Sequence, residues 1–192
     1  MFRAVAGDFR AIWRDGGSLA RASLVLLAVA AAMHLAALAG LGMNDVGFAV
    51  TGVPHVAVIV LGWCLVGRGF IGHYRGWRAR ASFRAFRGPP AWRLWILFAL
   101  IGLYMGAWAL YLASLGEGGA EVRDGAYVWL DGARTVREIT PAEYHHWNVA
   151  MLALFSAAWC WFSLVIAIGH WKTDAFHRSL ETRRAGDAPA AG

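Results

Sequence analysis

The sequence predicts an all-α membrane protein, an antiparallel bundle of four transmembrane helices with a small extracytoplasmic β-hairpin between the third and fourth helices. Three observations lead to this prediction. The 192-residue chain contains four long apolar runs without a charged residue, and its arginines gather at the ends of those runs. One stretch between the third and fourth runs alternates between apolar and polar residues, as strands do.

The composition supports a membrane protein and argues against a nucleic-acid-binding one. The chain is 59% hydrophobic and 16% charged, with a mean hydropathy of +0.48, whereas soluble domains carry about 25% charged residues. The formal net charge is +6, but the positive charges flank apolar runs, where they determine topology. Cys64 and Cys160 lie inside apolar runs, so we expect small buried side chains and no disulfide.

The four apolar runs cover residues 22–41, 47–67, 94–115 and 149–168, each close to the ~20 residues that cross a bilayer. Small residues recur three and four positions apart in the third and fourth runs, which lets helix backbones approach closely in lipid. We therefore expect the helices to pack against one another. A Gly-x-x-x-Gly match at 102–106 leaves homodimer formation through the third helix as an alternative.

Charge asymmetry between the loops predicts the orientation. Residues 68–93 contain seven arginines and no acid, whereas residues 116–148 contain six acids and three arginines. The positive-inside rule assigns the first of these loops, and both termini, to the cytoplasm. We expect a multi-pass protein of the bacterial cytoplasmic membrane, with residues 1–171 as the membrane domain and 172–192 as a partly disordered cytoplasmic tail.

Two features leave alternatives open. The basic start, the first apolar run and the small residues at 37–39 resemble a signal peptide, but the run is long for one and contains His34, so we expect an uncleaved span. In the arginine-rich loop, Phe70, Tyr74 and Trp77 recur at helical spacing. They favour an interfacial continuation of the second helix over a docking surface for an acidic partner.

Residues 116–147 form an insert that differs from the rest of the chain. The Asp-Gly sequence at 131–132 is a strong hairpin signal between two alternating segments. A two-residue turn there would set Trp129 opposite Arg134 and would place Tyr127 on the same aromatic face. Because an isolated two-stranded hairpin is barely stable in water, the hairpin must rest on another surface.

Residues 140–143 have the pattern of a capping box with proline at the first helical position. The helix that begins there would continue directly into the fourth span, without a flexible linker. The insert is therefore either a lid over the bundle or a recognition element for an extracytoplasmic or membrane protein. The candidate partner-binding residues are Tyr127, Trp129, Arg134 and Tyr144.

Two histidines inside the first two spans are candidate ligands. His34 and His55 fall at similar depths if these spans form an antiparallel hairpin. Ionisable residues inside a membrane are functional candidates by default. Two histidines from different helices can supply the axial ligands of a b-type haem.

His73 and His170 are weaker candidates for a second haem nearer the cytoplasm. In outline this arrangement resembles the four-helix cytochrome b561 type of membrane electron carrier, which implies b-haem and electron transfer. A metal site that combines His34 and His55 with His145 or His146 is another alternative, as are purely structural hydrogen bonds.

No catalytic residue is predicted. All twelve acids lie outside the four apolar runs, and the chain has no phosphate-binding loop, no dinucleotide fingerprint and no HExxH sequence. We therefore expect a non-enzymatic accessory, assembly or immunity-like subunit that acts through its hairpin and helix faces. The alternative is the b-haem electron carrier that uses His34 and His55.

Overall fold

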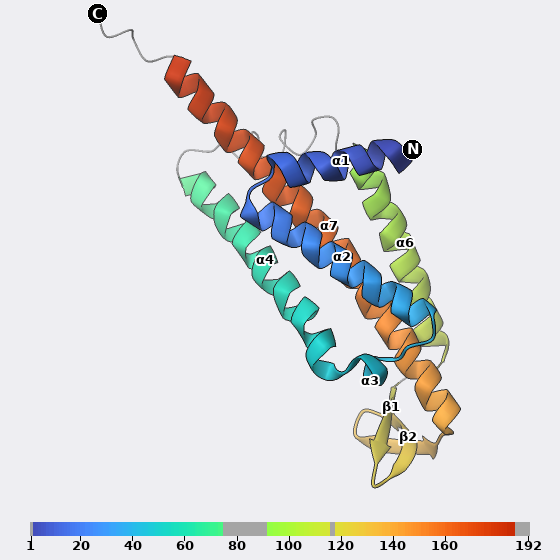
Figure 1. Cartoon of the computed structure of the whole chain (residues 1–192). Coiled ribbons are helices and arrows are strands. Elements are labelled where there is room, and N and C mark those ends of the chain that lie inside the picture. The colour runs from blue at the N-terminus through green and yellow to red at the C-terminus, as the bar shows by residue number, and fades with distance from the viewer. Residues whose placement is uncertain (1, 75–91, 116–117, 187–192) are drawn as a thin grey trace, which may run out of the picture. The chain divides into compact units, whose positions relative to one another are not determined.

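The computed structural model describes residues 2–74, 92–115 and 118–186 (Figure 1). The fold is mostly helical, at 79%, with one small antiparallel sheet. The helices are α1 (Phe2–Asp15), α2 (Ser18–Leu38), α3 (Met43–Val46), α4 (Phe48–Tyr74), α6 (Trp92–Ser114) and α7 (Pro141–Gly186), and the strands are β1 (Gly119–Arg123), β2 (Ala126–Asp131) and β3 (Arg134–Glu138).

Four helices in the described part of the chain are long and apolar enough to cross a membrane, in agreement with the four predicted runs. Their boundaries differ from the prediction mainly at the fourth, where α7 continues well past Ile168, to Gly186. The bundle packing, the membrane and the orientation stay predictions. The expected interfacial helix in the arginine-rich loop falls from residue 75 onward on residues outside the described part.

The internal contacts divide the chain into two compact units. The terminal unit comprises residues 1–26, 57–98 and 162–192, and the sheet-bearing unit comprises residues 27–56 and 99–161. Each of the four long helices contributes one part to each unit.

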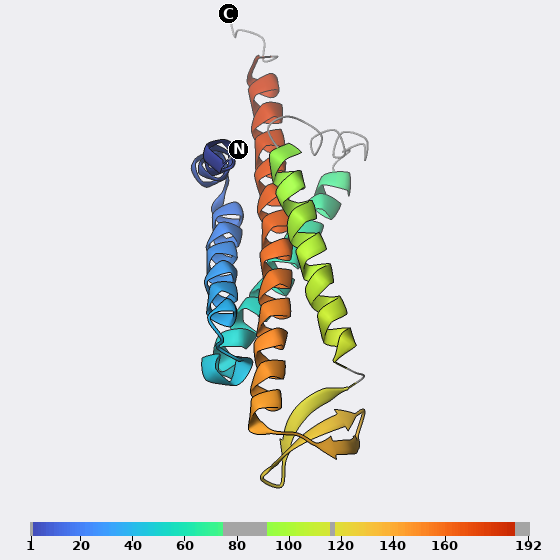
Figure 2. The same cartoon turned by 90° about the vertical axis from the view of Figure 1, so that its right-hand side faces the viewer.

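In the terminal unit, α1 is an additional helix that the apolar runs did not predict, and it runs across the direction of α2 (Figures 1 and 2). Its Ile12 is fully buried, whereas Trp13 is 53% exposed, so the helix has a buried and an open face. The carboxylate of Asp8 lies 3.7 Å from Arg93 at the start of α6. This ion pair links α1 to α6 within the terminal unit.

A glycine allows α4 and α7 to approach closely in the terminal unit. A Cβ atom at Gly169 would lie 2.5 Å from a terminal carbon of Leu65. Small residues have the same effect in membrane helices, where close backbone contact supplies van der Waals attraction. Gly169 lies one residue beyond the fourth predicted run, so the small-residue packing expected within that run stays a prediction.

The sheet-bearing unit contains three strands in the order β1-β2-β3, one strand more than the hairpin that was predicted. Both connections are two-residue turns. Asp124 and Gly125 have φ values of 53° and 82°, as a type I′ turn between β1 and β2 requires. Gly132, with φ 58°, begins the turn between β2 and β3, which is the position that type II′ turns give to glycine.

The predicted register between β2 and β3 is wrong. Asp131 pairs with Arg134, and an irregularity after Trp129 shifts the pairing so that Trp129 lies opposite Arg137. Two causes combine: the turn consists of residues 132–133 instead of 131–132, and the irregularity adds one residue to β3. An arginine does lie over the Trp129 ring, at 5.9 Å from its centre, but it is Arg137 and not Arg134.

The capping box is confirmed. The Thr140 hydroxyl accepts a hydrogen bond from the Glu143 amide at 3.2 Å, and the Glu143 carboxylate accepts one from the Thr140 amide at 2.8 Å. With Pro141 as the first residue of α7, only Ile139 and Thr140 separate the sheet from the helix. The sheet is therefore joined to α7 without a flexible linker.

We predict that Gly118→Ala disrupts the sheet much more than Gly125→Ala. Both glycines have positive φ, which costs an alanine about 1–2 kcal/mol. A Cβ atom at Gly118 would also lie 1.6 Å from the carbonyl oxygen of Leu130, whereas one at Gly125 would meet open space. Amide hydrogen exchange of β1 and β2 should accelerate clearly in Gly118→Ala and modestly in Gly125→Ala. Equal acceleration would show that the close backbone contact is not important.

Candidate functional site

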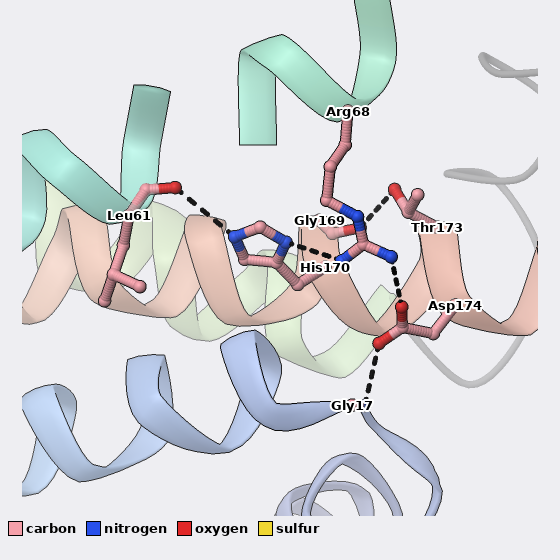
Figure 3. A network of polar contacts seen from close by, with 7 residues as sticks. All are labelled: Gly17, Leu61, Arg68, Gly169, His170, Thr173 and Asp174. Carbon is pink, nitrogen blue, oxygen red and sulfur yellow. Dashed lines mark hydrogen bonds and ion pairs between the residues drawn. The ribbon is translucent and has the colours of Figure 1, made fainter. Parts of the chain in front are cut away.

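The terminal unit contains a buried polar network centred on His170 of α7 (Figure 3). The imidazole has no exposed surface. Its Nδ1 lies 3.1 Å from a guanidinium nitrogen of Arg68, and its Nε2 lies 3.3 Å from the carbonyl oxygen of Leu61. Both partners come from α4, so the ring bridges α7 and α4.

The two partners assign the tautomer of His170. A guanidinium has only donors, and a carbonyl oxygen only accepts. Nδ1 therefore accepts from Arg68, and Nε2 carries the proton that it donates to Leu61. Neither ring nitrogen retains a free lone pair, so His170 in this arrangement does not fit the role of a haem or metal ligand.

Asp174, one turn after His170, extends the network to a third helix. Its carboxylate accepts a hydrogen bond from Arg68 at 2.5 Å and one from the amide of Gly17 at 2.7 Å. Gly17 immediately precedes α2, where a carboxylate satisfies an unpaired amide and interacts favourably with the helix dipole. The side chain of Asp174 is 12% exposed. The network thus joins α2, α4 and α7.

The sheet-bearing unit contains a second chain of polar contacts, through His34 of α2. The imidazole Nδ1 lies 3.0 Å from the Ser156 hydroxyl, and Nε2 lies 2.9 Å from the Tyr104 hydroxyl. Ser156 donates its own proton to the Leu152 carbonyl at 2.6 Å. The serine therefore accepts from Nδ1–H, and Tyr104 donates to Nε2. The chain runs from α6 through α2 to α7.

His55 has different neighbours from His34. Its Nδ1 accepts a hydrogen bond from the Trp159 indole at 3.4 Å, and its exposed ring also contacts Phe155. Among the described residues, no hydrogen bond or ring contact joins His34 and His55. Axial ligation by His34 would require it to give up one of its two hydrogen bonds, so this arrangement does not fit a bis-histidine haem. The haem alternative stays a prediction without structural support.

Of the other predicted histidines, the structure describes the surroundings of His145 and His146, and these two do not take part in a metal cluster. His145 lies 3.0 Å from the Gly40 carbonyl oxygen, and His146 contacts the Tyr111 hydroxyl. His73 lies in the last turn of α4, and its side chain is outside the described part. Among the residues that the structure describes, no three histidine, cysteine, aspartate or glutamate side chains converge as metal ligands would.

An apolar groove lies beside His146 in the sheet-bearing unit. It has a volume of about 350 Å³ and is bounded by α6 and α7. Its lining is aromatic and aliphatic, and it carries no charged group. The lining residues are Tyr104, Ala107, Trp108, Tyr111, His146, Val149 and Ala150.

The sheet rests on the first turns of α7 through two aromatic pairs. Trp129 meets Trp147 edge to face with ring centres 4.9 Å apart, and Tyr127 contacts Tyr144 at the same separation. Arg137 forms an ion pair with Glu143 at 2.9 Å. Edge-to-face pairs contribute about 0.5–1.5 kcal/mol beyond area burial. This support stabilises a sheet too small to be stable alone.

The aromatic packing changes which predicted partner-binding residues are accessible. Trp129 is only 9% exposed, and Tyr127 and Tyr144 are half-buried against each other. Arg134 is exposed on β3, and so are all the other residues of that strand. The open surface of the sheet is therefore β3, of which the sequence singled out only Arg134.

Sequence reasoning also missed the network formed by Arg68 and Asp174. Arg68 was counted among the arginines that determine topology, and Asp174 was assigned to the tail. One signal could have identified the second residue: His170 and Asp174 are four positions apart, and that spacing puts both on the same helix face.

Comparison of the chain with protein-family models, with curated proteins and with solved structures finds no significant match. The function therefore has to be inferred from the residues of this chain.

We predict that Asp174→Asn destabilises the protein by about 2 kcal/mol, since it leaves the half-buried Arg68 without a counter-charge. Equilibrium unfolding in mixed detergent micelles would measure this loss. Asp15→Asn is the matched control, because Asp15 forms an ion pair with Arg14 at the exposed surface. The control should change stability very little. Similar losses in both variants would contradict a special role for the buried network.

We also predict that Tyr104→Phe and Ser156→Ala are coupled through His34, although the two side chains belong to different helices. Each variant removes one end of the same hydrogen-bond chain, so their effects should depart from additivity by about 0.5 kcal/mol or more. A double-mutant cycle of unfolding free energies measures the coupling. Tyr104→Phe combined with Ser163→Ala is the control, and it should be additive. Additivity in both cycles would contradict the hydrogen-bond chain through His34.

Proposed function

We propose that this chain is a small non-enzymatic membrane protein, an accessory or assembly subunit that acts through an extracytoplasmic sheet. The observation that carries the proposal is the edge strand β3, in which all five residues are exposed although the sheet itself is firmly packed. The four long apolar helices supply the membrane anchor. The proposed location is the cytoplasmic membrane of a bacterium.

An exposed edge strand is a recognition surface because its backbone groups can pair with another strand. Soluble proteins usually protect such edges with proline, charges, bulges or a covering segment, and β3 has three charged residues and the irregularity at Val136 but no segment over it within the described part of the chain. β3 contains no proline, and Val136 in its middle is 58% exposed. A partner segment in extended conformation would extend the sheet and would cover this valine.

The charges on β3 favour an acidic partner segment. Arg134 and Arg137 lie at two of its five positions, against Glu138 alone. Arg137 already pairs with Glu143, whereas Arg134 has no ion pair within the described part of the chain. An acidic side chain on the partner strand would pair with Arg134. Complementary charge of this kind increases the rate of association and sets the strand register.

Because the sheet packs against α7, binding of a partner at β3 would also affect the first turns of that helix. A partner strand on β3 would stiffen a sheet whose aromatic side chains pack on Tyr144 and Trp147. With only two residues between β3 and α7, the first turns of the helix would be constrained with it. This coupling supports an accessory role over that of a passive lid.

The test is site-specific photocrosslinking in cells, with a photoreactive amino acid at Val136. A single dominant adduct is expected, and mass spectrometry should identify its crosslinked peptide as an extended acidic segment. A synthetic version of that peptide should bind the purified protein, and Arg134→Glu should weaken this binding at least ten-fold because it sets like charges against each other.

Val122 on β1, at the other edge of the sheet, is the matched control because it is 46% exposed and has the same side chain. The photoreactive residue at Val122 should not give the adduct. Equal crosslinking from the two edges, or peptide binding that tolerates Arg134→Glu, would overturn recognition through β3. The sheet would then be a lid.

A further inference from the structure

A second cavity lies in the terminal unit, where α1 turns into α2 beside α7. It has a volume of about 580 Å³, large enough for a phosphate group together with the polar part of a lipid. Three arginines line it against one carboxylate, so its electrostatic character is positive. The lining residues are Arg14, Asp15, Gly16, Gly17, Arg21, Trp171, Ala175 and Arg178.

The three arginines differ in whether other groups of the protein already bind their guanidinium groups. Arg14 forms a two-fold contact with Asp15, at 2.7 and 2.9 Å, which raises its pKa above the ordinary value. Arg21 donates to the carbonyl oxygens of Trp13 and Arg14 at the end of α1. These bonds neutralise Arg14 and hold Arg21 in position at the cavity.

Of the three arginines that line the cavity, Arg178 has the guanidinium most available to a ligand. It lies on α7 and is exposed, and its guanidinium has no hydrogen-bond partner among the residues that the structure describes, whereas its backbone carbonyl accepts a bond from Thr182. Arg178 lines the cavity, and after the hydrogen bond from Arg14 its charge also contributes to lowering the pKa of Asp15. An anion that entered the cavity would meet Arg178 and Arg21 without displacing Asp15. Guanidinium groups bind phosphate oxygens in this way, with paired hydrogen bonds.

The neighbouring surface of the terminal unit has the composition of a membrane interface. Trp13 is 53% exposed on α1, and Trp92, the first residue of α6, is 59% exposed. The open face of α1 also carries arginines, among them Arg10. Exposed tryptophans and arginines on a short amphipathic helix favour a position at the lipid headgroups. At that level a ligand would be surrounded by phospholipid phosphates.

We propose that this cavity binds the phosphate of an anionic phospholipid, with Arg178 and Arg21 as the principal contacts and Trp171 along the acyl side. The proposal concerns a different unit from the β3 recognition surface and does not depend on it. A bound lipid at this position would hold α1 and the end of α7 together at the membrane surface.

The test is native mass spectrometry of the full-length protein released from nanodiscs of phosphatidylglycerol and phosphatidylcholine in equal parts. One phosphatidylglycerol should stay bound per chain in preference to phosphatidylcholine. Arg178→Gln should reduce its retention at least about five-fold, because it removes a charge-assisted contact to the phosphate that a general surface charge does not make. Arg10→Gln is the matched control and should retain the lipid, because Arg10 is exposed on α1 but does not line the cavity.

A second arm separates a lipid headgroup from a free phosphate. The detergent-solubilised protein is titrated with inorganic phosphate and with glycerol phosphate, and the binding heat is recorded. Weak binding of both, with retention of the lipid, supports the proposal. Binding of a free phosphate that depends on Arg178 without lipid retention would overturn the lipid as the ligand. Equal loss of lipid in Arg10→Gln and Arg178→Gln would overturn the site itself.

Discussion

The carboxylate of Asp174 is the contact on which the organisation of the terminal unit depends, because it joins the guanidinium of Arg68 to the amide of Gly17. Between helices in lipid, apolar side chains contribute little to the specificity of helix pairing, because the lipid tails are equally apolar. Directional polar contacts supply such specificity, and the Asp174 carboxylate of α7 contacts Arg68 of α4 and the start of α2. In the sheet-bearing unit, His34 has the same role between Tyr104 and Ser156. In each unit, one participant belongs to α7.

The helices were predictable from the sequence because the lack of charges over about 20 residues is a strong, local signal. The capping box at Thr140 was predictable for the same reason. The third strand was missed although its signal was present: Asp124 and Gly125 form the same dipeptide as the one recognised at 131–132. Helix α1 was missed because an amphipathic helix with several charges does not resemble a membrane span.

The candidate sites were harder to predict, because a polar residue's role depends on which partners the fold brings to it. The sequence identified His34 and His170 as unusual, but it could not indicate that each would have both ring nitrogens occupied. In the sequence, Arg68 stands at the end of an apolar run, as the arginines that determine topology do. The register of β3 depended on a single irregularity after Trp129, which no local pattern revealed.

The dependence of the sheet on α7 has a consequence for biosynthesis. All three strands precede α7 in the chain, yet the rings that cover Trp129 and Tyr127 belong to Trp147 and Tyr144. During translation the strands leave the ribosome first and lack this support until the next segment follows. The sheet therefore gains its full support only when the first turns of α7 have formed, so a segment that comes later in the chain completes the folding of an earlier one.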